Sequence, residues 1–327
     1  MNHSTFKSFT FGIGLFFTLP LVYGNSSSPS SSDGTLYINK SKTHKVAPVK
    51  YGFHYEEIGM MGEGALHAEL IRNRSFEEAT PPAGLSVKNG LYENVPAPRV
   101  KEKKVFQADP LIGWTTYPLS YTPVFISRTD ENPMGGENKY SMLVNVTEDI
   151  ANHSDALILN RGYYGMNLKT DTSYRLSLFL KNRNYSAPLR VFLVDEWGQR
   201  VSNVIEVNVG NRDWTKYTGE LKPEKNVRRG MFAIQPMSKG QFQIDVVSLF
   251  PSDTWNDGKS VFRKDIVQNL KEFSPSFIRF PGGCIVHGVN EETMYHWKKT
   301  LGPIENRSGQ WSKWAPYYRT DGIGYHE

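Results

Sequence analysis

The chain has 327 residues, of which 39% are hydrophobic and 13% aromatic; this is enough apolar material for two ordinary domains and excludes a disordered protein. Lysine and arginine exceed aspartate and glutamate by 38 to 33, but the surplus is scattered, so no basic stripe or recognition helix points to a nucleic-acid partner. The single cysteine, Cys284, excludes an internal disulfide.

The first residues have the composition of an export signal followed by a linker. Lys7 precedes an apolar run over residues 11–22, and the small Gly24 closes it. Glycine and proline interrupt this run, which is too short for a membrane span. We therefore predict a cleaved secretory signal over residues 1–24, a flexible serine-rich linker over residues 25–34, and a secreted or periplasmic protein without a membrane span.

The next segment has the pattern of an α/β domain. A short strand is predicted over residues 35–38 and a second over residues 46–55, which ends at the acidic pair Glu56 and Glu57. Glycines then open a turn, and apolar residues recur with helical spacing over residues 65–71. The order is strand, glycine-rich loop and helix.

Between residues 79 and 252 the pattern is that of strands. Hydrophobic and polar side chains alternate in short runs that are separated by turn residues, for example at residues 174–181, 189–194 and 240–250. Many short strands without intervening helices are typical of a β-sandwich or jelly roll.

From residue 253 onward the helical period returns. Apolar side chains fall on one face of a predicted helix at Phe262, Ile266, Leu270 and Phe273. A proline ends this helix, and residues 276–280 form a strand that runs into a glycine turn. A helix that leads into a strand with a glycine loop at its carboxyl end is typical of a (β/α) barrel.

These patterns combine into one predicted fold of the α/β plus all-β class. Residues 35–78 begin a (β/α)8 TIM barrel, and residues 253–327 continue it without completing it. A jelly-roll β-sandwich over residues 79–252 is inserted between the first and second barrel strands.

Two strand ends carry the candidate functional residues, because the carboxyl ends of barrel strands form the site face. Glu56 follows the first strand; the alternative is an exposed acidic side chain at a loop entrance. Arg279 lies inside an apolar strand and must pair or face a polar cavity, since an unpaired buried charge is very costly. Glu56 is its expected partner, and a purely structural ion pair is the alternative.

Other chemistry is not indicated by the motifs. Aromatic residues are dense between residues 295 and 325, where they could stack on sugar rings or simply form core. Histidine and cysteine spacing fits no metal site, and nucleotide-binding or nucleophile-elbow fingerprints are absent, so neither a metal nor a cofactor is predicted. Cys284 alone is more typical of a buried hydrophobe than of a nucleophile.

Five segments form an ordered set of motifs. They are Tyr51-Gly-Phe-His-Tyr-Glu-Glu-Ile-Gly59, Ala68-Glu-Leu-Ile-Arg-Asn-Arg-Ser-Phe-Glu77, Ile278-Arg-Phe-Pro-Gly-Gly-Cys284, Tyr295-His-Trp-Lys-Lys-Thr-Leu-Gly-Pro303 and Thr320-Asp-Gly-Ile-Gly-Tyr-His-Glu327. Together they resemble the α-L-arabinofuranosidases of glycoside hydrolase family 51. The strand-rich segment between them resembles a carbohydrate-binding-module insertion of the family 4 type.

The resemblance implies a retaining glycosidase that releases terminal α-L-arabinofuranose from hemicellulose or pectin side chains. Its expected partners are arabinose-containing polysaccharides or oligosaccharides, and the full-length protein is open to homo-oligomer formation. Retaining chemistry needs two carboxyl groups about 5–5.5 Å apart. In the family both are glutamates of later barrel strands, which places them beyond Glu327, so the chain is expected to be an inactive N-terminal portion without catalytic residues.

The resemblance also assigns substrate-binding residues. Glu56 and Arg279 match residues that hold the arabinose, Cys284 matches a position beside the sugar, and Trp314 matches an aromatic on the leaving-group side. Glu57 is expected to be structural.

Two alternatives stay open. One is a secreted, non-catalytic glycan-binding protein in which the sandwich does the binding. The other is a glycosidase of a related barrel family that acts on β-xylosides or glucuronides.

Overall fold

A computed structural model describes most of the chain after residue 50. The described residues are 38–39, 41, 43–45, 51–79, 86–88, 91–95, 104–107, 109–119, 121–150, 155–288, 291, 294–307, 309–311 and 318–327. The chain divides into two compact units, residues 1–48 and 49–327. The predicted signal and linker lie outside the described residues, and so does the strand predicted over residues 35–38 except for Ile38. Among the described residues, no helix is both long and apolar enough to cross a membrane.

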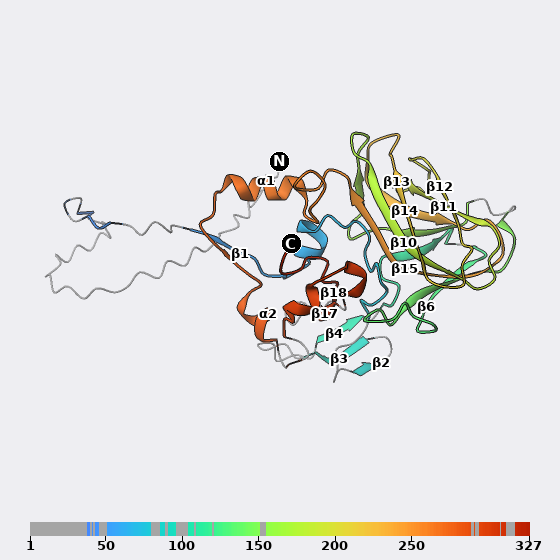
Figure 1. The fold of residues 1–327 in the computed structure, drawn as a ribbon, viewed down its shortest axis with the longest axis horizontal. Helices are drawn as coiled ribbons and strands as arrows, with labels where there is room; N and C mark the ends of the chain where they lie inside the picture. Colours follow the sequence, from blue (N-terminus) through green and yellow to red (C-terminus); the bar gives the residue numbers. More distant parts are fainter. Residues whose placement is uncertain are drawn as a thin grey trace, which may run out of the picture. The chain divides into compact units, whose positions relative to one another are not determined.

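Two antiparallel sheets make up most of the second unit (Figure 1). Their strands are β5 (Trp114–Tyr117), β6 (Val124–Thr129), β7 (Ser141–Val146), β8 (Leu157–Asn160), β9 (Met166–Leu168), β10 (Tyr174–Asn182), β11 (Pro188–Val194), β12 (Ile205–Asn208), β13 (Thr215–Leu221), β14 (Val227–Gln235) and β15 (Gly240–Pro251). One sheet has the order β13-β10-β15-β7-β6, and the other has the order β12-β11-β14-β8-β5, with β9 beside β14. We call these strands and their loops the two-sheet unit.

One hydrophobic core lies between the two sheets. On β10, Leu176, Leu178 and Leu180 are buried and alternate with more exposed residues, because successive strand residues point to opposite faces. Leu189 and Val191 of β11 enter the same core from the other sheet. Each fully buried side chain of this kind stabilises the fold by about 1.5–3 kcal/mol. The strand-rich character predicted between residues 79 and 252 is confirmed.

The elements outside the two-sheet unit are short. They are β1 (Phe53–His54), the π-helix η1 (Gly62–Leu66), β2 (Ser86–Lys88), β3 (Leu91–Val95), β4 (Lys104–Gln107), α1 (Lys264–Glu272), β16 (Ile278–Arg279), α2 (Gly283–His287), the 3-10 turns η3 (Trp297–Thr300) and η4 (Ile304–Asn306), β17 (Gln310–Trp311) and β18 (Tyr318–Arg319). Strands β2, β3 and β4 form a small antiparallel sheet. Strands β1 and β16 pair in parallel, with His54 opposite Arg279.

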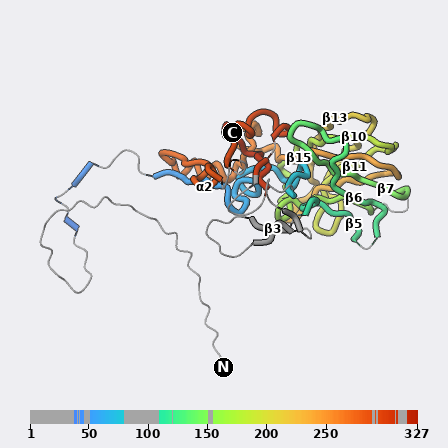
Figure 2. The backbone as a smooth tube through the Cα atoms, turned by 90° about the horizontal axis from the view of Figure 1, so that it is seen from below, coloured from blue at the N-terminus to red at the C-terminus, as the bar shows by residue number. Residues whose placement is uncertain are grey.

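The helix predicted over residues 65–71 is largely wrong. Helical structure ends at Leu66, and the chain then runs alongside β15, where the Leu70 amide donates to the Leu249 carbonyl at 3.0 Å. Because β15 and the Glu69 carboxylate take up the backbone donors of this segment, a helix cannot form there. In Figure 2 the blue tube of this segment lies beside the strands of the two-sheet unit. The helix and strand predicted after residue 261 are confirmed as α1 and β16.

Candidate functional site

The candidate site lies where the parallel strands β1 and β16 end. Parallel strands bring their carboxyl ends to the same edge, so the residues that follow them meet there. Glu56 comes two residues after β1, and Arg279 is the last residue of β16. The His54 imidazole lies between them: its Nε2 is 2.7 Å from Arg279 Nη1 and 3.4 Å from Glu56 Oε2.

The expected direct ion pair between Glu56 and Arg279 is wrong. In the described part of the chain both side chains contact His54, and no ion pair joins them to each other. Arg279 is also exposed, because among the described strands β16 has only β1 as a neighbour. The expectation that Arg279 must pair because its charge is buried therefore does not apply. His54 was missed, although its position two residues before Glu56 puts both side chains on one side of an extended chain.

A glycine turn closes the site beside Glu56. Gly282 has φ 105°, in the region that favours glycine, and a Cβ there would lie 2.4 Å from Cδ of Glu56. A Cβ at Gly283 would lie 3.0 Å from Nη2 of Arg279. The half-buried Cys284 follows in α2. The structure thus brings Glu56, Arg279 and the turn before Cys284 together, whereas Trp314 lies outside the described residues.

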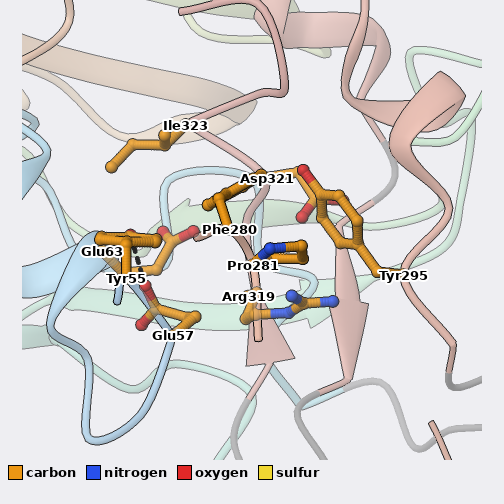
Figure 3. Close-up of a pocket in the computed structure, with 9 residues that line it drawn as sticks. All are labelled: Tyr55, Glu57, Glu63, Phe280, Pro281, Tyr295, Arg319, Asp321 and Ile323. Carbon is orange, nitrogen blue, oxygen red and sulfur yellow. Dashed lines mark hydrogen bonds between the residues drawn. The ribbon is translucent and has the colours of Figure 1, made fainter. Parts of the chain in front are cut away.

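A small cavity lies behind this turn (Figure 3). Its lining residues are Tyr55, Glu57, Glu63, Phe280, Pro281, Tyr295, Arg319, Asp321 and Ile323. At about 20 Å³ it has room for a single water molecule. None of the predicted sugar-binding residues lines it, since Tyr55 and Glu57 alternate with Glu56 along the chain.

Burial raises the pKa of two acids that line the cavity, Glu63 and Asp321. Burial raises the pKa of Glu63 to about 8, and the neighbouring Glu57 adds to this, while the hydrogen bond from Thr320 and the charge of Arg74 oppose it. Burial likewise raises the pKa of Asp321. The Glu63 carboxyl accepts the Thr320 amide at 3.0 Å and the Thr320 hydroxyl at 2.5 Å. The hydrogen bonds of Glu63 join η1 to the residues that follow β18. Glu63 and Asp321 line the cavity and not the candidate sugar site.

Glu57 and Glu327 occupy two different environments. Glu57 is buried and accepts a hydrogen bond from the Tyr55 hydroxyl at 3.1 Å, the dashed contact in Figure 3. The Glu327 side chain is partly buried, and its carboxylate pairs with the buried Arg307 at 2.5 Å. Among the residues that the structure describes, no group of three or more His, Cys, Asp or Glu side chains could hold a metal ion.

Known proteins share both the sequence and the fold of this chain. Residues 269–327 match a family model described as the alpha-L-arabinofuranosidase 1 domain. Alpha-L-arabinofuranosidase 1 of Arabidopsis thaliana is 28% identical over 85% of this chain, and an extracellular exo-alpha-L-arabinofuranosidase of Streptomyces chartreusis is 27% identical over 85%. An arabinose-bound MgGH51 α-L-arabinofuranosidase superimposes with a TM-score of 0.70 and 25% identity over 88% of this chain.

The chain is similar to the family 51 α-L-arabinofuranosidases. The chain spans 37% of the Arabidopsis relative, 30% of the Streptomyces relative and 43% of the solved structure. Its fold over residues 49–327, rich in sheet and poor in helix, is consistent with that of the solved family 51 structure.

Proposed function

We propose that the whole protein is a secreted, retaining α-L-arabinofuranosidase. It would hydrolyse terminal α-L-arabinofuranosyl residues from the side chains of hemicellulose or pectin. The observation that carries this proposal is the meeting of Glu56, His54 and Arg279 at the carboxyl ends of two parallel strands in a chain similar to the family 51 enzymes.

This arrangement suits the recognition of sugar hydroxyls. The Glu56 carboxylate accepts hydrogen bonds and the Arg279 guanidinium donates them, and hydrogen bonds to ionised groups are about twice as strong as neutral ones. Arg279 is exposed and Glu56 is half-buried, so solvent reaches both side chains. Cys284 would lie beside the sugar, and Trp314 would line the leaving-group side.

The two catalytic carboxyl groups are proposed to follow Glu327. The raised pKa of Glu63, about 8, is that of a general acid, but its carboxyl is occupied by Thr320 and faces the cavity. Glu57 is likewise buried on the cavity side. Neither can reach a sugar held by Glu56, so the bond-breaking pair required for retention has to come from other strands.

The domain organisation is part of the same proposal. Residues 1–24 would be the signal peptide and residues 25–34 the linker. Residues 35–78 and 253–327 would begin a TIM barrel, and residues 79–252 would be its jelly-roll insertion. The parallel pairing of β1 with β16, with α1 leading into β16, supports this assignment.

The decisive experiment assays the full-length protein on aryl glycosides. We expect hydrolysis of aryl α-L-arabinofuranoside and none of aryl β-xyloside or β-glucuronide, while the 327-residue chain alone releases no nitrophenol. Glu56→Ala and Arg279→Ala should each cost about 2–4 kcal/mol of transition-state stabilisation, or roughly 30- to 1000-fold in kcat/KM.

Arg190→Ala is the matched control, because Arg190 is an exposed arginine that pairs with Glu206 on the two-sheet unit. It should leave kcat/KM unchanged. Cleavage of the xyloside but not the arabinofuranoside, or wild-type kcat/KM in Glu56→Ala, would contradict the proposal. Light scattering of the same preparation checks the homo-oligomer that the family likeness suggests.

Glycan binding by the two-sheet unit is a second candidate function. The Trp197 side chain is 72% exposed, and the Tyr117 ring lies near the following residue, 3.6 Å from where a Cβ of Gly198 would stand. Exposed aromatic rings can stack on sugar faces. Trp197→Ala should weaken retention of the protein in gels that contain arabinoxylan without changing hydrolysis of the aryl substrate; unchanged retention removes this function.

A further inference from the structure

Residues 69–78 are built into the two-sheet unit although they precede it in the chain; we call them the connecting segment. Ile71 and Phe76 are fully buried in the core between the two sheets. The Phe76 ring packs against Trp114 of β5, with 5.6 Å between the ring centroids. The connecting segment therefore contributes apolar side chains to the same core as the strands.

The backbone of the connecting segment completes one edge of β15. Strand β7 pairs with β15 only from Gly240 to Ile244, so the later part of that edge is open to another partner. The Leu70 amide donates to the Leu249 carbonyl at 3.0 Å, and the Val247 amide donates to the Arg74 carbonyl at 2.9 Å. These bonds fix the position of Arg74 relative to the strand.

The Arg74 side chain reaches from this strand edge to the loop of residues 318–323. It is 2% exposed, and its Nη2 donates to the Thr320 carbonyl at 3.1 Å. On the other side, the Thr320 amide and hydroxyl donate to Glu63 at 3.0 and 2.5 Å. Thr320 is thus held between Arg74 of the connecting segment and Glu63 of η1.

Arg74 is also the common positive charge among several buried acids. Its charge acts on Glu63, Glu69, Asp245 and Asp321, and each of these is buried. Among the described residues, Nε and Nη1 of Arg74 have no hydrogen-bond partner, and neither has Oδ2 of Asp245. Buried polar atoms in this condition are usually bridged by ordered water. Removing the guanidinium would take a favourable positive charge away from each of these acids.

The held loop lies behind the candidate sugar site. Asp321 and Ile323 line the small cavity together with Phe280 and Pro281, and the next residue, Gly282, packs on Glu56. A displacement of residues 318–323 would therefore shift the glycine turn at Gly282, which closes the candidate sugar site.

We propose that Arg74 is a positioning residue through which the two-sheet unit fixes the loop of residues 318–323 behind the candidate sugar site. The two-sheet unit then acts as a scaffold for the site and is not a detachable module. The consequence for sugar affinity rests on the proposed function, whereas the structural coupling does not.

Hydrogen exchange in the full-length protein tests the coupling directly. In Arg74→Met, amides of residues 318–323 should exchange at least about tenfold faster, because the loop loses a charge-assisted hydrogen bond. Arg74→Lys keeps the charge but not the planar fork, so it should show a smaller increase in exchange. Strands β10 and β11 should keep their exchange rates.

The matched control is Arg183→Met, which removes an arginine that pairs with Glu131 inside the two-sheet unit. It should leave residues 318–323 unchanged. Unchanged exchange of the loop in both Arg74 variants overturns the proposal, and so does equal acceleration in the control or in β10 and β11. If Arg74→Met does not fold, the exchange of residues 318–323 in Arg74→Lys decides whether the proposal holds.

Kinetics add a readout that a purely structural role would not move. In Arg74→Lys, KM for aryl arabinofuranoside should rise by roughly three- to tenfold with kcat nearly unchanged, as expected when binding common to ground and transition states is lost. A fall in kcat at constant KM would contradict positioning. Absence of arabinofuranosidase activity in the wild type would contradict the proposed function and leave the exchange result standing.

Discussion

Glu63 shows how burial controls the chemistry of single residues in this chain. Its pKa is about 8 in the folded chain and near 4.5 when the chain unfolds. The folded state therefore binds more protons between these two values, so the contribution of Glu63 to stability is complete below pH 4.5 and is lost as the pH rises through 8. His67 has the opposite sign, since burial lowers its pKa from 6.5 to about 3 and its contribution is lost as the pH falls below 6.5.

Replacing Glu63 by glutamine should flatten the pH dependence of stability. In the wild type, this one group makes the free energy of unfolding fall by up to about 1.4 kcal/mol per pH unit between pH 5 and 8. Glu63→Gln keeps the shape of the side chain but does not titrate. Urea unfolding at four pH values in this range measures the slope. An identical slope in the variant would show that Glu63 does not titrate with a raised pKa.

The sequence predicted part of the site at this scale. Glu56 was found because it follows an apolar strand and Arg279 because it lies within one, and the two strands do pair in parallel. The bridging role of His54 could not be predicted, because it depends on the register that sets His54 opposite Arg279. The exposure of Arg279 was missed for the same kind of reason, since a strand pattern does not reveal how many neighbours the strand has.

The connecting segment is the element whose structure departs most from its sequence pattern. Its first residues belong to the helical spacing predicted over residues 65–71, yet it runs as an irregular strip along β15. The partner that decides this, around Leu249, lies about 180 residues later, and local periodicity carries no information on such a contact. Helix α1 and strand β16 were predicted correctly because periodicity and the following proline are local signals.

Shortening the Phe76 side chain of the connecting segment should destabilise the whole two-sheet unit. Phe76→Ala opens a cavity in a fully buried core and should cost about 3–5 kcal/mol. Phe273→Ala removes the same side chain at the end of α1, where it is 61% exposed, and should cost less than about 1 kcal/mol. Chemical unfolding followed by circular dichroism compares them. Similar losses in both variants would mean that Phe76 does not belong to the core.

Over the whole molecule, we expect the backbone amides to differ in their protection from hydrogen exchange. The two-sheet unit has a continuous core, whereas β1 and β16 form a sheet of two strands. Phe277 and Ile278 are more than half exposed beside it. Two-stranded sheets are marginal on their own in water.

Hydrogen exchange of the 327-residue chain should reveal this difference. Amides of β1, α1 and β16 should exchange through local opening, well before those of β10 and β11, which open only with global unfolding. In the full-length protein the same amides should become slower if further strands pair with β16, as proposed. Equal protection throughout the short chain would contradict this prediction.

The burial of Asn73 has a consequence for how the protein can be produced. Asn73-Arg-Ser75 matches the acceptor sequence for N-linked glycans. Yet Asn73 is 1% exposed, and its Nδ2, the atom that would carry the sugar, donates to the Pro110 carbonyl at 3.0 Å. A glycan added during synthesis would therefore prevent the connecting segment from docking.

Ser75→Ala removes the acceptor sequence and keeps Asn73, so in a eukaryotic secretory host it should raise the yield of folded protein. In a bacterial host the yield should not change. Mass spectrometry that finds a glycan on Asn73 of folded protein would refute this. The choice of expression host therefore decides whether residues 69–78 can dock on the two-sheet unit.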